Sequence, residues 1–254
     1  MAKNKLAKFA EMDTLSNVFQ PRHEEIFRTD YKLKGKWNAG VFRNNHPVIL
    51  EIGCGKGEYT VELAKLFPEK NFIGLDIKGA RMWKGAKMAA AENLSNVAFL
   101  RMYAELLESA FAPEEVAEIW ITFPDPQMSK ARKRLTGTRF LSLYQKILRP
   151  DALIHLKTDS PFLYAYTAEV LKTNHLPATI QTEDLYGCGY ENKILGIKTF
   201  YEKQWLSRGK KIKYICFSLN NTVPLTEPDT EIEKDDYHSE TRFMNTDGYL
   251  RNNQ

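Results

Sequence analysis

The sequence predicts an α/β fold built on a doubly wound, mostly parallel sheet with an antiparallel edge. From residue 48 to residue 173, short apolar segments typical of buried strands alternate with segments of helical periodicity. This alternation is typical of a parallel sheet that helices cover on both faces, with right-handed crossovers. After residue 175 the pattern changes to two strands around a helix, which predicts the antiparallel edge.

The expected elements follow one another closely. Strands are predicted at residues 48–52, 71–76, 97–102, 116–123 and 152–158, and helices at residues 57–67, 78–93, 137–148 and 161–173. Pro68 just past the first helix and Pro161 in the first turn of the last agree with these boundaries. The later strands are expected at residues 178–185 and 212–219, with a helix at 199–207 between them.

Length and composition fit one such domain with extensions at both ends. The chain has 254 residues, of which 43% are hydrophobic and 27% charged, so a sizeable core is available. We divide it into a basic N-terminal extension (1–45), a central domain (46–222) and a polar, acidic tail (223–254). The extension is expected to be irregular apart from a helix near residues 23–29, and the tail to be loosely ordered or to wrap the surface.

The same sequence disfavours several classes of protein. The N-terminus does not resemble a signal peptide, and no apolar run approaches the ~20 residues that span a bilayer. Cys54, Cys188 and Cys216 are widely spaced and the histidines are isolated, which argues against a disulfide framework and against a metal site. His155 is expected to be a core residue. We therefore expect a cytoplasmic protein without a metal, as a monomer or a homodimer.

A glycine loop joins the first strand to the first helix. Gly53, Gly55 and Gly57 allow a sharp turn and close approach to a ligand, and the helix start offers free N–H groups. The spacing differs from the dinucleotide pattern, because Glu58 stands at the place of its third glycine. Glu51, just ahead of the loop, would repel a pyrophosphate and suits a cationic ligand such as S-adenosylmethionine.

Asp76 closes the second strand. An ionised carboxylate has only acceptors, so this side chain can bind both hydroxyls of a ribose. A plain strand–helix turn with Asp76 as a helix cap would also explain the pattern. The glycines, the acid before them and the acid after the second strand occur together, and this combination favours S-adenosylmethionine as the cofactor.

The segment Phe123-Pro-Asp-Pro126 follows the fourth strand, at the place that faces the transferred methyl group in such enzymes. With the basic run and the Leu-Thr behind it, the segment resembles the TrmB family of tRNA (guanine-N7-)-methyltransferases. Residues 71–76, Lys157-Thr-Asp159 and Thr199-Phe-Tyr-Glu202 are similar to further motifs of that family. The resemblance covers about residues 48–219 and implies a Rossmann-like class I S-adenosylmethionine-dependent methyltransferase domain.

The resemblance also implies a reaction and roles for particular residues. A methyl group passes to N7 of a guanosine in the variable loop of tRNA, and Asp125 lies at the reaction centre as the catalytic residue. Lys130, Asp159, Thr199 and Glu202 join Asp125 as the implied substrate-binding residues. The implied cofactor-binding residues are Glu51, Gly53, Gly55, Gly57, Asp76, Tyr103 and Ala104.

Two places depart from the family pattern. Tyr103, which Ala104 follows, stands where the family has an Asp after the third strand, so either Tyr103 stacks on the adenine or Glu105 supplies the carboxylate. The basic loop after residue 126 is shorter than in the family, and the family's substrate lysine falls on Ser129 by direct count. Lys130 is taken as its functional counterpart.

Basic residues flank the predicted site. One group comprises Lys130, Arg132, Lys133, Arg134 and Arg139, and a second comprises Lys203, Arg208, Lys210, Lys211 and Lys213. Lysines near the N-terminus add to them, and the net charge is +4. One basic run is usually a solvated face, but two runs around one site favour contact with RNA phosphates.

The residues alone leave other functions open. One is methylation of another RNA, a small molecule or an exocyclic amine, although an Asp here splits the two prolines that amine methylases of nucleic acids often carry together. A nicotinamide-dependent oxidoreductase is disfavoured by Glu51 and Glu58. A non-catalytic RNA-binding protein on this scaffold remains compatible with Tyr103 and the altered loop.

Overall fold

A computed structural model describes residues 2–190, 192–219 and 224–235 of the chain. In chain order its strands are β1 (Val18–Phe19), β2 (Val48–Ile52), β3 (Asn71–Leu75), β4 (Val97–Leu100), β5 (Val116–Thr122), β6 (Leu148–Thr158), β7 (Ala178–Thr182) and β8 (Lys213–Ser218). Its helices are α1 (Ala2–Met12), α2 (His23–Ile26), α3 (Glu58–Leu66), α4 (Gly79–Ala91), α5 (Leu107–Ala110), α6 (Thr138–Gln145), α7 (Pro161–Thr173) and α8 (Phe200–Ser207). Short turns η1 (Asn38–Phe42), η2 (Ala104–Leu106) and η3 (Ala131–Lys133) complete the described elements.

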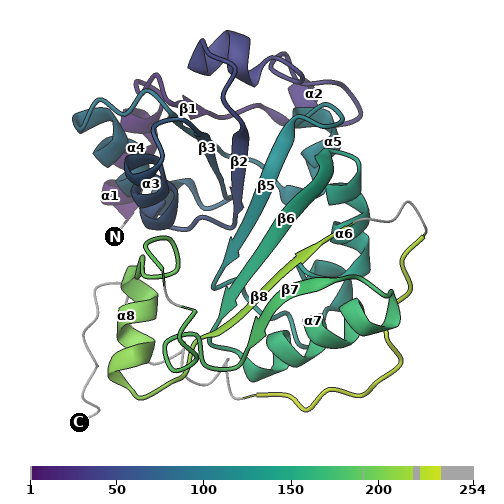
Figure 1. Cartoon of the computed structure of the whole chain (residues 1–254). Helices are drawn as coiled ribbons and strands as arrows, with labels where there is room; N and C mark the ends of the chain where they lie inside the picture. The colour runs from purple at the N-terminus through teal and green to yellow at the C-terminus, as the bar shows by residue number, and fades with distance from the viewer. Residues whose placement is uncertain (1, 191, 220–223, 236–254) are drawn as a thin grey trace.

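The strands form one sheet in the order β1-β4-β3-β2-β5-β6-β8-β7 (Figure 1). Pairing is parallel from β1 through β6, whereas β8 is antiparallel to β6 and β7 is antiparallel to β8. The predicted doubly wound, mostly parallel sheet with an antiparallel edge is therefore confirmed. The expected strand and helix boundaries agree with the structure within a few residues, except that β6 begins at Leu148 rather than at residue 152.

Helices cover both faces of the sheet, with α1, α3, α4 and α8 on one side and α5, α6 and α7 on the other (Figure 1). Two hydrophobic clusters fill the layers between helices and sheet. Successive side chains of a strand point to opposite faces, so Trp120 of β5 packs in the cluster that contains Tyr59 of α3. Its neighbour Ile121 packs in the cluster that contains Phe140 of α6.

The N-terminal extension is more regular than expected. Helix α1 packs on α4, where the indole N–H of Trp83 donates a 2.7 Å hydrogen bond to Glu11 and Met12 is buried. Strand β1 pairs with β4 through Val18 and Phe99 and adds an edge to the sheet. A strand of two residues is too short for its periodicity to be visible in the sequence.

Residues 224–235 lie against α6 and α7, as expected for a tail that wraps the surface. Glu227 accepts hydrogen bonds from the hydroxyls of Thr138 (2.6 Å) and Tyr166 (2.7 Å). Asp235 accepts one from the amide of Phe162 (3.2 Å). Both acids lie at helix N-termini, where the helix dipole favours negative charge. The remainder of the tail lies outside the described residues, and among those residues no helix has the length and apolar character of a membrane span.

Candidate active site

The glycine loop has the backbone conformation that its composition predicts. Gly53, Gly55 and Gly57 all have positive φ angles, of 78°, 56° and 69°, which side-chain-bearing residues adopt only with strain. The amide of Gly53 donates to the carbonyl oxygen of Leu75 at 2.8 Å, which fixes the loop against the end of β3. A Cβ at Gly53 or Gly55 would meet no atom closer than 3.8 Å, so the loop backbone borders open space.

Asp76 holds the loop from the end of β3. Its Oδ2 atom accepts a 2.9 Å hydrogen bond from the amide of Gly55, and its Oδ1 atom accepts one of 2.7 Å from the amide of Lys78. The carboxylate is partly exposed and lines a pocket. It therefore both fixes the loop and presents acceptors to a ligand beside it.

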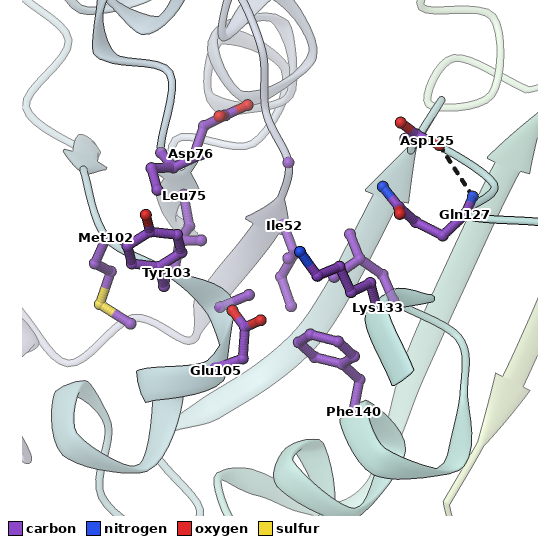
Figure 2. A pocket seen from close by; sticks show the side chains of 14 residues that line it. Ile52, Leu75, Asp76, Met102, Tyr103, Glu105, Asp125, Gln127, Lys133 and Phe140 are labelled. Atoms are coloured by element: carbon purple, nitrogen blue, oxygen red, sulfur yellow. Dashed lines mark hydrogen bonds between the residues drawn. The ribbon is translucent and has the colours of Figure 1, made fainter. Parts of the chain in front are cut away.

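The pocket has a volume of about 250 Å³ and lies at the carboxyl ends of β2, β3, β4 and β5 (Figure 2). Its lining consists of Ile52, Gly53, Leu75, Asp76, Ile77, Met102, Tyr103, Ala104, Glu105, Asp125, Gln127, Lys133, Leu135 and Phe140. Apolar side chains such as Ile52 and Met102 suit a flat base, and the carboxylates suit hydroxyls and a cation. This is the crevice in which open α/β sheets bind ligands.

Asp125 is held rigidly at the rim of the pocket. Pro124 and Pro126 on either side of it are buried, while Asp125 itself is exposed. Phe123 and Gln127 have φ angles of 51° and 49°, which is unusual for residues with side chains and is typical of functional sites. The Oδ1 atom of Asp125 accepts a 3.0 Å hydrogen bond from the amide of Gln127 (Figure 2).

Glu51 lies beneath the loop and not in the pocket lining. Its carboxyl group accepts hydrogen bonds from the amide of Thr60 (2.9 Å), from the Thr60 hydroxyl and from the hydroxyl of Thr122 (2.6 Å). Burial raises the pKa of Glu51 to about 7, against the opposing effect of these hydrogen bonds. Glu51 thus joins β2, β5 and α3 under the loop, where we had expected a charge directed at the cofactor.

The segment that follows β4 contributes to the pocket the residues predicted to contact the adenine. Tyr103, Ala104 and Glu105 line the pocket, and Tyr103 is 58% exposed. Both an aromatic face and a carboxylate are therefore present on one wall (Figure 2).

Lys130 and Lys133 differ in position. Lys130 is exposed and is not among the lining residues, whereas Lys133 in η3 extends into the pocket (Figure 2). The basic run marked this loop, but the turn that directs Lys133 inward leaves no periodic signal in so short a segment. Met102, Gln127 and Phe140 of the lining were likewise not among the predicted site residues.

The remaining predicted substrate residues lie outside this lining. Asp159 is buried directly after β6. Its neighbour Ser160 caps α7, because the Ser160 hydroxyl accepts from the amide of Leu163 at 3.1 Å. Thr199 caps α8 by accepting from the amide of Glu202 at 3.2 Å. Glu202 is fully buried, and its carboxylate lies 2.9 Å from the amino group of Lys157.

Side chains that could bind a metal ion are dispersed in the described part of the chain. No group of three or more metal-binding side chains occurs among these residues. His155 is a buried core residue, as expected, with its Nδ1 atom 2.7 Å from the Tyr214 hydroxyl and its ring stacked on Trp120. The pocket beside the glycine loop brings Gly53, Asp76 and Asp125 together and is the candidate active site.

Comparisons with known proteins agree with this site. A family model described as "Putative methyltransferase" matches residues 45–215. The chain is 58% identical over 235 residues to a tRNA (guanine-N(7)-)-methyltransferase of Porphyromonas gingivalis, with 91% of this chain and 96% of that protein covered. It is 52% identical over 242 residues to the protein of the same name from Bacteroides thetaiotaomicron, with 95% and 96% covered.

The solved structure of the 16S rRNA methyltransferase KamB has a TM-score of 0.52 and 18% identity to this chain, and the match covers 70% of this chain and 88% of that one. This likeness shows a shared fold of the class I methyltransferase type. The relatives in sequence, the matched family model and the ordered motifs together show the family. The chain belongs to the TrmB family of tRNA (guanine-N7-)-methyltransferases.

Proposed function

We propose that this chain transfers a methyl group from S-adenosylmethionine to N7 of a guanosine in the variable loop of tRNA, in the cytoplasm. The observation that carries the proposal is the position of Asp125, which lies exposed between two buried prolines on the pocket that Asp76 and the glycine loop also border. The names of the relatives support both the tRNA and the N7 atom.

The residues of the pocket fit the proposed cofactor. Asp76 offers acceptors to the ribose hydroxyls, and Tyr103 or Glu105 lies where the adenine would bind beside Met102. The positive-φ glycines allow the ligand to approach the backbone closely. Glu51 contributes from below, because its hydrogen bonds to Thr60 hold the first turn of α3. Bound there, S-adenosylmethionine supplies an electrophilic methyl group.

The chemistry places modest demands on the protein. Guanine N7 carries a free lone pair, as its role as an acceptor in DNA shows, so no general base has to remove a proton. The site must instead hold the guanine in line with the methyl group. Asp125 can accept hydrogen bonds from N1–H and the amino group of guanine, which selects guanine over adenine. Its charge also stabilises the positive charge that develops on the base.

The tRNA must be bound largely through its phosphates. Arg132, Lys133 and Arg139 lie on or beside the loop that follows Asp125, and Lys203 and Arg208 lie on α8 or at its end. We assign these basic residues, together with Lys130, to the RNA surface, with residues 46–222 as the catalytic domain. Asp159 and Thr199 are assigned to the substrate side of the site.

A transfer assay with matched transcripts tests the proposal. Unmodified tRNA and a copy with adenosine in place of the variable-loop guanosine are incubated with the enzyme and methyl-labelled S-adenosylmethionine. Label should enter the first transcript only. Equal labelling of both, or labelling of neither, would contradict the assignment. Asp125→Asn in the same assay should abolish transfer, while S-adenosylhomocysteine binds it as it binds the natural protein.

A further inference from the structure

The loop before α8 and α8 itself, residues 192–207, form a segment that we call the α8 arm. It packs on the same face of the sheet as α3 (Figure 1), and Leu195 and Trp205 share a hydrophobic cluster with Tyr59. Two hydrogen bonds join the arm to residues of α3. Glu58 accepts a 2.7 Å hydrogen bond from the amide of Phe200, and the hydroxyl of Tyr59 donates to the carbonyl oxygen of Ile194 at 3.0 Å.

Glu58 is the residue that stands in place of the third dinucleotide glycine, at the first position of α3. Its second carboxylate oxygen is 2.9 Å from the amino group of Lys84. Burial opposes ionisation of Glu58, but the Phe200 amide and Lys84 outweigh it and lower its pKa. Glu58 therefore presents a full negative charge to the N-terminus of α8, where the helix dipole favours one.

A second attachment joins the arm to the end of β6. The amino group of Lys157 donates to the carbonyl oxygens of Leu195 (3.0 Å) and Ile197 (3.1 Å) and pairs with Glu202 at 2.9 Å. The side chains of Lys157 and Glu202 are both fully buried. The hydroxyl of Tyr186 adds a 2.5 Å hydrogen bond to Glu202.

The two attachments of the α8 arm lie on either side of strand β5. Strand β5 lies between β2, which leads into Glu58, and β6, which ends beside Lys157. The segment with Asp125 leaves the sheet at the end of β5, and the amide of Phe123 donates to the backbone carbonyl of Lys157 at 2.8 Å. The arm is thus fixed on both sides of the strand end that carries the proposed catalytic residue.

A buried ion pair is a poor source of stability, because desolvation offsets the attraction and apolar residues of similar size do as well. The pair does restrict the arm, because a movement that left either buried charge unpaired would be costly. We propose that Glu58 and Lys157 are positioning residues that hold the α8 arm in register with Asp125, so that Thr199 and the basic residues of α8 meet the tRNA. Glu202 contributes to this arrangement by pairing with Lys157 and by donating its amide to Thr199 at the start of α8.

The inference rests on the proposed function, and its test is a steady-state comparison of tRNA and cofactor. Glu58→Gln and Lys157→Met should raise KM for tRNA about tenfold, the effect of losing one charge-assisted contact. Affinity for S-adenosylhomocysteine should stay within about twofold of the natural protein, since neither residue lines the pocket.

Two matched controls separate positioning from general stability. Glu62→Gln alters an exposed acid one turn along α3 that pairs with Lys65, and Glu118→Gln alters a largely buried acid that pairs with His155. Both should leave KM for tRNA unchanged. An unchanged KM in folded Glu58→Gln would overturn the proposal, as would an equal rise in the controls. If Lys157→Met does not fold, Glu58→Gln decides.

Amide hydrogen exchange of residues 192–207 gives a readout that needs no activity. Exchange there should increase in Glu58→Gln and Lys157→Met and stay at the natural level in both controls. Unchanged exchange in both variants would show that Glu58 and Lys157 do not hold the α8 arm in place, and would overturn the proposal. If the natural protein does not methylate tRNA, but exchange in the arm increases in the two variants as described, only the proposed function is contradicted.

Discussion

The amide of Phe123 donates a 2.8 Å hydrogen bond to the backbone carbonyl of Lys157, and Asp125 and Asp159 each follow two residues beyond these partners. Thr122 and Lys157 are also paired in the parallel register of β5 and β6. Two carboxylates that lie far apart in the sequence therefore leave the sheet from neighbouring strand ends. The geometry of the candidate site depends on this register.

Replacement of Asp125 should separate chemistry from cofactor binding. Asp125→Asn keeps an oxygen for the Gln127 amide but turns a donor toward guanine N1–H or its amino group. We expect kcat/KM to fall at least ~100-fold, in line with the loss of a charge-stabilising group. Binding of S-adenosylhomocysteine, measured by calorimetry, should be nearly unchanged. Turnover within about threefold of the natural enzyme would remove Asp125 from the mechanism.

A methyl group at Gly57 should destabilise the fold. Its Cβ would lie 2.5 Å from a ring carbon of Phe99, and its φ of +69° already strains any L-residue. We expect Gly57→Ala to lower the free energy of unfolding by about 2–4 kcal/mol, measured in urea. Gly209→Ala is the matched control, because Gly209 has a similar φ of +73° with open space around it. We expect Gly209→Ala to lower the free energy of unfolding by about 1 kcal/mol, which represents the backbone strain alone. Equal losses in the two variants would show that contact with Phe99 does not destabilise Gly57→Ala.

The pair formed by Glu118 and His155 should make stability depend on pH. Burial disfavours both charges, but the attraction between the Glu118 carboxylate and the His155 ring, whose nearest atoms are 3.2 Å apart, outweighs it, together with Cys216 beside His155 and with Lys70 and Trp120 beside Glu118. The pKa of Glu118 is lowered to about 2, so its contribution is present above its usual 4.5 and is lost as the pH falls toward 2. The pKa of His155 is raised, so its contribution is present below its usual 6.5 and is lost as the pH rises through the folded-state value.

Both contributions are therefore present between pH 4.5 and pH 6.5. Thermal unfolding of Glu118→Gln should show a larger loss of Tm at about pH 5.5 than at an alkaline pH above the folded-state pKa of His155. An equal loss at both pH values would mean that the imidazole carries no charge in the fold.

Lys130 and Lys133 should have different effects on activity. Lys133 lines the pocket, so Lys133→Ala should lower kcat/KM about tenfold or more. Lys130 is exposed outside it, so Lys130→Ala should leave kcat unchanged and reduce the slope of log affinity for tRNA against log salt by about 1. Filter binding over a salt series measures the slope. The reverse assignment of effects would restore Lys130 as the residue that acts at the site.

The sequence was sufficient to predict most of the fold. Alternating apolar strands and amphipathic helices determine a parallel sheet, and the boundaries of β2 and α7 agree with the prediction residue for residue. The N-terminal extension was less predictable, because β1 gains its strand conformation only by pairing with β4. Tertiary contact, rather than local propensity, determines such short elements.

The candidate site was predictable where the backbone requires a particular residue. The glycines with positive φ and Asp76 at a strand end are local requirements, and the structure has them side by side. The direction of a side chain is not a local property. Glu51 lies beneath the loop because Thr60 and Thr122 bind it, and Lys133 enters the pocket because of a short turn.

The central claim is methylation of guanine N7 in tRNA, and mapping the modified base tests it most directly. Unmodified tRNA is incubated with the enzyme and S-adenosylmethionine, reduced with borohydride and cleaved with aniline, which breaks the chain at 7-methylguanosine. We predict a single cleavage, in the variable loop, that is absent without the cofactor. Intact tRNA despite cofactor binding, or cleavage at a different guanosine, would contradict this account.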